Sequence, residues 1–64
     1  MYTDRDINMM KFGYKGKVNI IDLNRTAYVL DYYDDGTFDV RFRNDDDQLI
    51  TLRVTADCVE KAVA

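Results

Sequence analysis

The chain has 64 residues, a formal net charge of −3, one cysteine, and no histidine or proline. A chain of this length holds one small domain, whose core supplies only about 3–5 kcal/mol unless a disulfide, a metal or a partner contributes. The lone cysteine excludes an internal disulfide, and the lack of histidine excludes the usual Cys/His zinc sites, so these counts favour a reducing compartment.

The charge is unevenly distributed along the chain. Residues 1–30 hold five basic and three acidic side chains, whereas residues 31–64 hold four basic and nine acidic ones. The acidic second half argues against a protein that wraps nucleic acid by phosphate neutralisation alone, and it suits a basic partner.

The first residues are the least defined by pattern. Thr3 and Asp6 have the spacing of a capping box, so residues 1–13 form either a short helix or an irregular arm. The opening segment carries acids and lacks the basic and apolar regions of a secretory signal, and no apolar run is long enough to cross a bilayer. We therefore expect a soluble, cytoplasmic protein without a membrane partner.

Beyond the turn at Gly13–Gly16, the pattern predicts a β-domain over residues 14–64. Residues 17–20 alternate, and residues 26–33 are rich in β-branched and aromatic side chains. Asp35 and Gly36 then supply a hairpin turn.

The next segment, residues 38–43, alternates without interruption, so its apolar side chains share one face that meets the core. The predicted inward residues of this strand are Phe38, Val40 and Phe42. After a turn at residues 44–47, another strand can point Ile50, Leu52 and Val54 inward. A short helical turn at residues 55–57 precedes Val59, which we expect to close the core.

Three segments together carry a family resemblance: Gly16–Val18, Ala27–Tyr32 and Asp35–Phe42, followed by an acidic turn. They resemble the Tudor-like branch of the SH3-like barrels over roughly residues 14–60. The resemblance implies an all-β fold, a small antiparallel SH3-like barrel of four or five bent strands that close on themselves. Tudor domains that bind methylated lysine or arginine use an aromatic cage, and the turn at residues 44–47 contributes no aromatic residue to one. The fold serves unrelated partners and does not choose a function.

Tyrosines are the first candidates for a binding surface, because they offer a large contact area at low entropic cost. The predicted ligand-binding residues are Tyr14, Tyr28 and Tyr33, with Asp31 and Asp34 beside them. These rings either cover the open end of the barrel or, with the aspartates, bind a cationic group or a protein.

Strand alternation places Tyr28 outward together with Leu30. Tyr32 and Tyr33 point to opposite faces unless a bulge intervenes, so one of them belongs to the core.

The run of Asp45, Asp46 and Asp47 forms a predicted acidic patch that could bind a basic protein surface. Aspartates that hydrogen-bond their own turn explain the run more simply. Its spacing does not match a calcium loop, and we predict no metal site.

A basic and aromatic mix in the first half supports an alternative, a nucleic-acid surface. Its members are Lys11, Lys15, Lys17 and Arg25, interleaved with Phe12 and Tyr14. Three further arginines, Arg41, Arg43 and Arg53, are expected to lie across from aspartates on adjacent strands.

Catalysis has little chemistry to draw on, since histidine is absent and no phosphate-binding loop occurs. Cys58 is interpreted as a small buried apolar residue. We predict no enzyme and no cofactor, but a non-catalytic protein-binding module, of the phage or bacterial accessory kind, acting through an acidic, tyrosine-bearing surface. The alternative is a nucleic-acid-associated barrel that uses the basic first half. A homo-oligomer paired through its β-edges also stays open.

Overall fold

The computed structural model describes residues 1–62 and begins with a helix, α1 (Asp4–Phe12). Thr3 caps this helix, because its Oγ1 accepts from the Asp6 amide at 3.2 Å while the Asp6 carboxylate accepts from the Thr3 amide at 3.2 Å. This reciprocal pair satisfies two amides that a helix start would otherwise leave without partners. Of the two alternatives for the N-terminal segment, the short helix is therefore correct.

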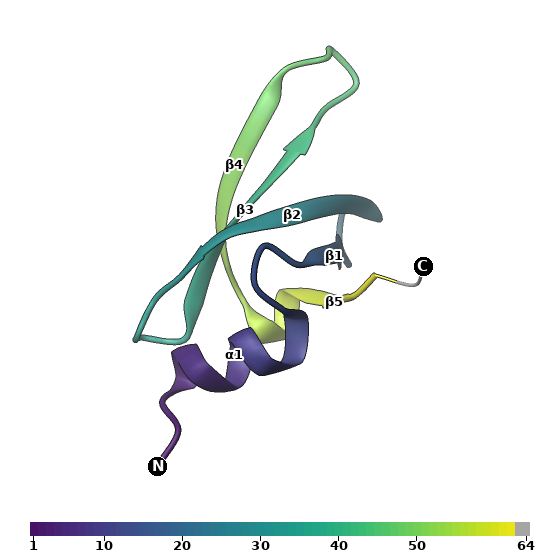
Figure 1. The fold of residues 1–64 in the computed structure, drawn as a ribbon. Helices are drawn as coiled ribbons and strands as arrows, with labels where there is room; N and C mark the ends of the chain where they lie inside the picture. The colour runs from purple at the N-terminus through teal and green to yellow at the C-terminus, as the bar shows by residue number, and fades with distance from the viewer. Residues whose placement is uncertain (63–64) are drawn as a thin grey trace.

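Five strands follow the helix and form one antiparallel sheet in the order β4-β3-β2-β1-β5 (Figure 1). Their bounds, with one turn of 3-10 helix before the last, are β1 (Lys17–Ile20), β2 (Arg25–Tyr32), β3 (Thr37–Arg43), β4 (Leu49–Thr55), η1 (Ala56–Cys58) and β5 (Val59–Lys61). The prediction of a small, mostly β, antiparallel fold is confirmed, and so is a helical turn before the last strand. The predicted β-domain also includes residues 63–64, which lie outside the described residues.

The sheet is compatible with an SH3-like barrel, but it does not close. Within residues 1–62, β4 and β5 are the two edges, and no ladder joins them. The expectation of strands that close on themselves was therefore wrong. Figure 1 shows the β3–β4 hairpin projecting away from the rest of the sheet, while β5, which follows η1, pairs with β1.

The turn between α1 and β1 needs a glycine at position 16. A Cβ there would lie 1.7 Å from the Phe12 carbonyl oxygen, a separation that no side chain can adopt. The Gly16 carbonyl also accepts from the Val29 amide at 2.9 Å. This close approach fixes the end of α1 against the sheet.

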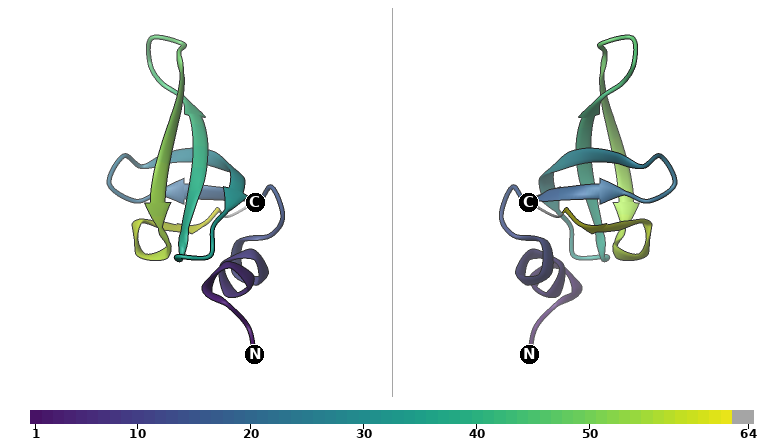
Figure 2. Two further views of the ribbon diagram at one scale, coloured as in Figure 1. Left: turned by 90° about the vertical axis from the view of Figure 1, so that its left-hand side faces the viewer. Right: turned by 90° about the vertical axis from the view of Figure 1, so that its right-hand side faces the viewer.

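The core lies on the inner face of the sheet, and α1 covers one end of it (Figure 2). Phe38 is central, with ring centroids 5.4 Å from those of both Phe12 and Tyr32. The buried apolar residues are Phe12, Val18, Ile20, Ala27, Val29, Tyr32, Phe38, Val40, Phe42 and Val59. The inward positions predicted for β3 and for Val59 are confirmed.

A β-bulge in β2 decides which of two adjacent tyrosines is buried. Val29 pairs with Val40 and Asp31 with Asp39, so one extra residue, Leu30, is accommodated in β2. The bulge shifts the alternation and turns Tyr32 inward, where its hydroxyl donates to the Gly13 carbonyl at 2.6 Å.

Two expectations about burial need correction. Leu52 lies opposite Val40 on the core face but is 36% exposed, because β4 is an edge strand with nothing beyond it. Cys58, expected to be buried, is exposed in η1. Its neighbour Val59 is the residue that enters the core, so Cys58 stays at the surface.

In the part of the chain that the structure describes, no helix has the length and apolar character needed to cross a membrane.

Candidate binding groove

Three side chains form a row across the outer face of the sheet. Lys17 on β1 pairs with Tyr28 on β2, and Tyr28 pairs with Arg41 on β3. Directly opposed residues on adjacent strands have Cβ atoms about 5 Å apart, so the tyrosine ring stands between two cations. Tyr28 is 55% exposed.

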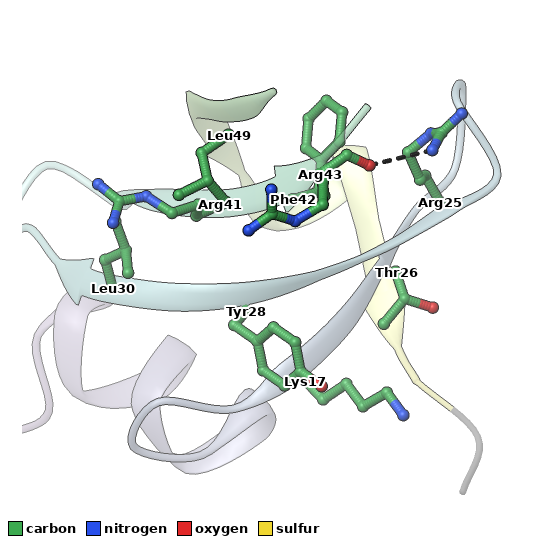
Figure 3. Close-up of a pocket in the computed structure, with 9 residues that line it drawn as sticks. All are labelled: Lys17, Arg25, Thr26, Tyr28, Leu30, Arg41, Phe42, Arg43 and Leu49. Atoms are coloured by element: carbon green, nitrogen blue, oxygen red, sulfur yellow. Dashed lines mark hydrogen bonds between the residues drawn. The ribbon is translucent and has the colours of Figure 1, made fainter. Parts of the chain in front are cut away.

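This row lies in a groove of about 580 Å³ on the outer face (Figure 3). No acidic residue lines the groove. Four basic residues do, namely Lys17, Arg25, Arg41 and Arg43. The exposed apolar part of the lining consists of Tyr28, Leu30 and Leu49. A concave surface that combines cations with exposed apolar side chains is typical of a binding site.

The end of the groove near the β3–β4 turn is electrically neutralised. Arg25 reaches the Asp45 carboxylate at 2.5 Å and the Arg43 carbonyl oxygen at 3.1 Å. Arg43 contacts Asp47 through its carboxylate at 3.3 Å and its carbonyl oxygen at 2.9 Å. These two arginines therefore hold the turn in place and have little charge left for a ligand.

The other end of the groove keeps its charge. Among residues 1–62, neither Lys17 nor Arg41 takes part in an ion pair, and Arg41 only donates from Nε to the Thr51 hydroxyl at 3.1 Å. Leu30, 41% exposed, lies beside Arg41 at this end (Figure 3). An anionic group beside Arg41, or beside Lys17 on the other side of Tyr28, therefore meets a cation that has no carboxylate partner among residues 1–62.

The predicted acidic patch is largely tied up in its own turn. Asp45 and Asp47 are bound by the arginines, and the Asn44 side chain accepts from the amides of Asp46 and Gln48 at 3.0 and 2.9 Å. Asp46 is the member of the run that is left exposed without an ion pair in the described chain.

Tyr33 belongs to a different cluster, at the opposite end of β2. Its hydroxyl donates to Asp39 at 2.7 Å, and the Arg53 guanidinium stacks over its ring at 4.1 Å. Arg53 also pairs with Asp39 at 3.2 Å. The hydrogen bond from Tyr33, followed by Arg53, lowers the pKa of Asp39, and the same hydrogen bond is the main reason that the pKa of Tyr33 is raised.

The remaining predicted site residues do not join either group. Tyr14 lies in the turn between α1 and β1, 75% exposed, with the Lys15 amine 5.6 Å from its ring centroid. Asp31 is exposed on β2 and accepts from the Tyr32 amide at 2.9 Å, and Asp34 is exposed in the β2–β3 turn. The structure thus separates the predicted tyrosines and aspartates, and only Tyr28 lies in the groove.

Sequence reasoning missed the part that β3 and β4 play in the groove. Arg41 and Arg43 were expected to face aspartates across strands, which Arg53 does with Asp39, whereas Arg41 faces Tyr28 and Thr51. Without the β2 bulge, the register would place Tyr28 opposite Phe42 instead. A bulge leaves no clear signal in the sequence, so the pairing could not be predicted.

The groove offers recognition chemistry. In the described residues, no group of three or more cysteine, aspartate or glutamate side chains gathers into a metal-binding cluster. Comparison of the chain with protein-family models, curated proteins and solved structures finds no match.

Proposed function

We propose that the chain is a non-catalytic protein-binding module that takes its partner in the outer-face groove. The observation that carries the proposal is Tyr28, which is 55% exposed between Lys17 and Arg41 at the centre of a concave surface. Tyrosine and arginine are enriched among the residues that dominate binding energy at protein interfaces. Leu30 and Leu49 add apolar area that a partner would cover.

This proposal moves the binding surface from the acidic side of the protein to the basic groove. Asp45 and Asp47 are engaged by Arg25 and Arg43, so they have less charge to offer a basic partner. The cytoplasmic location and the role as an accessory protein of a phage or bacterium remain part of the proposal.

A relation to Tudor-like domains is also proposed. It is supported by the strand order and by the hairpin, in which the Asp35 carboxylate accepts from the Thr37 amide at 3.0 Å and from its hydroxyl at 2.6 Å. Recognition of a methylated side chain by Tyr33 does not form part of it, because the Arg53 guanidinium already lies over that ring.

Nucleic acid is the second candidate, favoured by the same four basic residues that line the groove. Lys11 and Lys15, which the sequence grouped with Lys17 and Arg25, do not line it. The candidate therefore depends on the groove alone.

A pull-down from the source cell tests the proposal. The wild type, Tyr28→Ala and Tyr14→Ala are compared, each with and without nuclease. Tyr14→Ala is the matched control, because it removes an exposed tyrosine outside the groove. Protein partners that survive nuclease and Tyr14→Ala but disappear with Tyr28→Ala are expected. Partners that all disappear after nuclease would select the nucleic-acid candidate, and partners indifferent to Tyr28→Ala would place the binding surface elsewhere.

A further inference from the structure

We infer that the groove recognises an acidic segment of a partner protein, in which an aliphatic or aromatic side chain is flanked by two carboxylates. This inference rests on the proposed function and names the chemistry of the partner. It follows from the charge left in the groove, from the apolar side chains between the charges, and from the acids that border one end.

The first step is the number and position of the available cations. Arg25 and Arg43 are held by Asp45 and Asp47, whereas Lys17 and Arg41 form no ion pair within the described chain. These two lie on β1 and β3 with β2 between them, so their backbones are about 10 Å apart, twice the spacing of neighbouring strands. Two carboxylates of one segment could reach both.

The second step is the apolar surface between and beside these cations. The Tyr28 ring stands in the middle of the row, and Leu30 and Leu49 are 41% and 57% exposed in the same groove. An apolar side chain placed over Tyr28 would remove this surface from water, which is favourable in proportion to the area covered. A ligand that carried only two charges would leave Tyr28, Leu30 and Leu49 exposed to water.

Two unpaired cations beside exposed leucines suit an acidic protein segment better than a nucleic-acid strand. A single strand that neutralises two cations would show a slope of only about −1.4 in the logarithm of affinity against the logarithm of salt concentration, which indicates weak phosphate-driven binding. Exposed leucines offer little to phosphates or sugars. The observations therefore favour a protein segment over a nucleic-acid strand.

The aspartates at one end of the groove determine where the carboxylates of a partner can bind. Asp45 and Asp47 border the groove beside Arg25 and Arg43, so a further carboxylate at that end would meet like charges. The carboxylates of the partner should instead lie beside Lys17 and Arg41, on either side of Tyr28. A basic segment would be repelled by Lys17 and Arg41, the two cations of the lining that form no ion pair within the described chain.

The test is selection from a displayed library of random 12-residue peptides on three forms of the protein. These are the wild type, the Lys17→Glu/Arg41→Glu variant, and a Lys11→Glu/Lys15→Glu control with the same change of net charge outside the groove. Selected peptides are then synthesised, and their affinities for these three forms and for Tyr28→Ala are measured by fluorescence anisotropy at low and high salt, with a 12-nucleotide oligouridine as the nucleic-acid probe.

Peptides that bind the wild type and the control equally are expected to carry two acids around an apolar residue. They should bind Lys17→Glu/Arg41→Glu at least about tenfold more weakly, the effect of losing more than 1.4 kcal/mol. Lys17→Gln/Arg41→Gln, which introduces no repulsion, should give a smaller loss in the same direction, and thermal melts check that both variants fold.

Other outcomes overturn distinct claims. Peptides that need Tyr28 but carry no acids would overturn the inferred chemistry and leave the protein-binding proposal standing. A library that yields no peptide dependent on Tyr28, Lys17 or Arg41 would overturn both. Oligouridine that binds more tightly than every selected peptide would replace the protein segment with nucleic acid.

Discussion

Tyr28 and Tyr33 lie five residues apart along β2 and the turn after it, yet the charged groups beside Tyr33 pair with one another and those beside Tyr28 do not. Tyr33 donates its hydroxyl to Asp39 and carries the Arg53 guanidinium on its ring. Tyr28 is flanked by two cations that form no ion pair in the described part of the chain, and more than half of it is exposed. An exposed tyrosine beside a charged side chain is therefore a better candidate for binding a partner when that side chain forms no ion pair within the described chain.

The same distinction applies to the arginines of the outer face. Arg53 and Arg25 each meet a carboxylate from another strand or turn, and each holds two parts of the chain together. Among residues 1–62, the Arg41 side chain hydrogen-bonds the Thr51 hydroxyl and forms no ion pair. Ion pairs at an exposed surface contribute little stability, so the residues left out of them cost the fold little and remain free to bind.

The largest expected effect tests the buried inner face of the sheet, which lies beneath the outer-face groove. We expect Val40→Asp to unfold the domain, because Val40 is fully buried opposite Val29 and the new carboxylate would have no partner. Far-UV circular dichroism and urea titration measure this. Arg41→Asp, one residue further along β3 on the outer face, is the control and should still unfold cooperatively. A Val40→Asp melt close to wild type would mean that the two faces are wrongly assigned.

A pair of aromatic truncations should separate core from groove. Phe42→Ala is expected to lower the free energy of unfolding by about 3–5 kcal/mol, because Phe42 is buried in the core. Tyr28→Ala should change it by less than about 0.5 kcal/mol, as is usual for exposed positions. Because the larger loss equals the roughly 3–5 kcal/mol that such a core supplies, Phe42→Ala should be largely unfolded without urea, whereas Tyr28→Ala should keep a cooperative urea transition. The reverse order would contradict the placement of Tyr28 outside the core.

Part of the loss of stability in acid should come from Asp39, in the Tyr33 region. The pKa of Asp39 is lowered in the folded protein, first by the hydrogen bond from Tyr33. A carboxyl whose folded pKa lies below its unfolded value adds stability at pH values above the unfolded pKa, about 4, and that stability is lost as the pH falls through the folded pKa. Asp39→Asn should therefore lose less stability than wild type between about pH 5 and pH 2, as measured by urea midpoints. An unchanged pH profile would show that Asp39 does not contribute.

The smallest effect distinguishes the two hydroxyl groups. Tyr33→Phe loses the hydrogen bond to Asp39, so we expect a small decrease in the urea midpoint at neutral pH, whereas Tyr28→Phe should leave the midpoint unchanged. The pKa of Tyr33 is raised in the folded state, so its contribution is present below about pH 10 and is lost as the pH rises through the folded value. Tyr33→Phe should flatten this alkaline loss. Equal midpoints for both variants at neutral pH would contradict the comparison.

Much of the fold could be predicted from local pattern. The uninterrupted alternation of β3 identified its buried face, and the Asp35–Gly36 pair located the hairpin, because both signals depend on residues close in the sequence. The candidate site was predicted only in part, through Tyr28 with Leu30 beside it and through Lys17 and Arg25 of the basic group. Arg41, Arg43 and Leu49 enter the groove from strands whose register with β2 depends on a bulge, and the neutralisation of Asp45 depends on Arg25, 20 residues away.

The sequence by itself indicated the capping box, the succession of strands along the chain and the apolar face of β3, since helix capping and strand alternation act between neighbouring residues. Only the tertiary structure decided which charges meet. The bulge between Val29 and Asp31 places Tyr28 opposite Arg41, and the β3–β4 turn brings its aspartates to the arginines of the groove. The strand register decides which side chain lies beside each charged residue, and therefore which charges form ion pairs. Within the described chain, this register leaves Lys17 and Arg41 as the groove cations that no carboxylate pairs with.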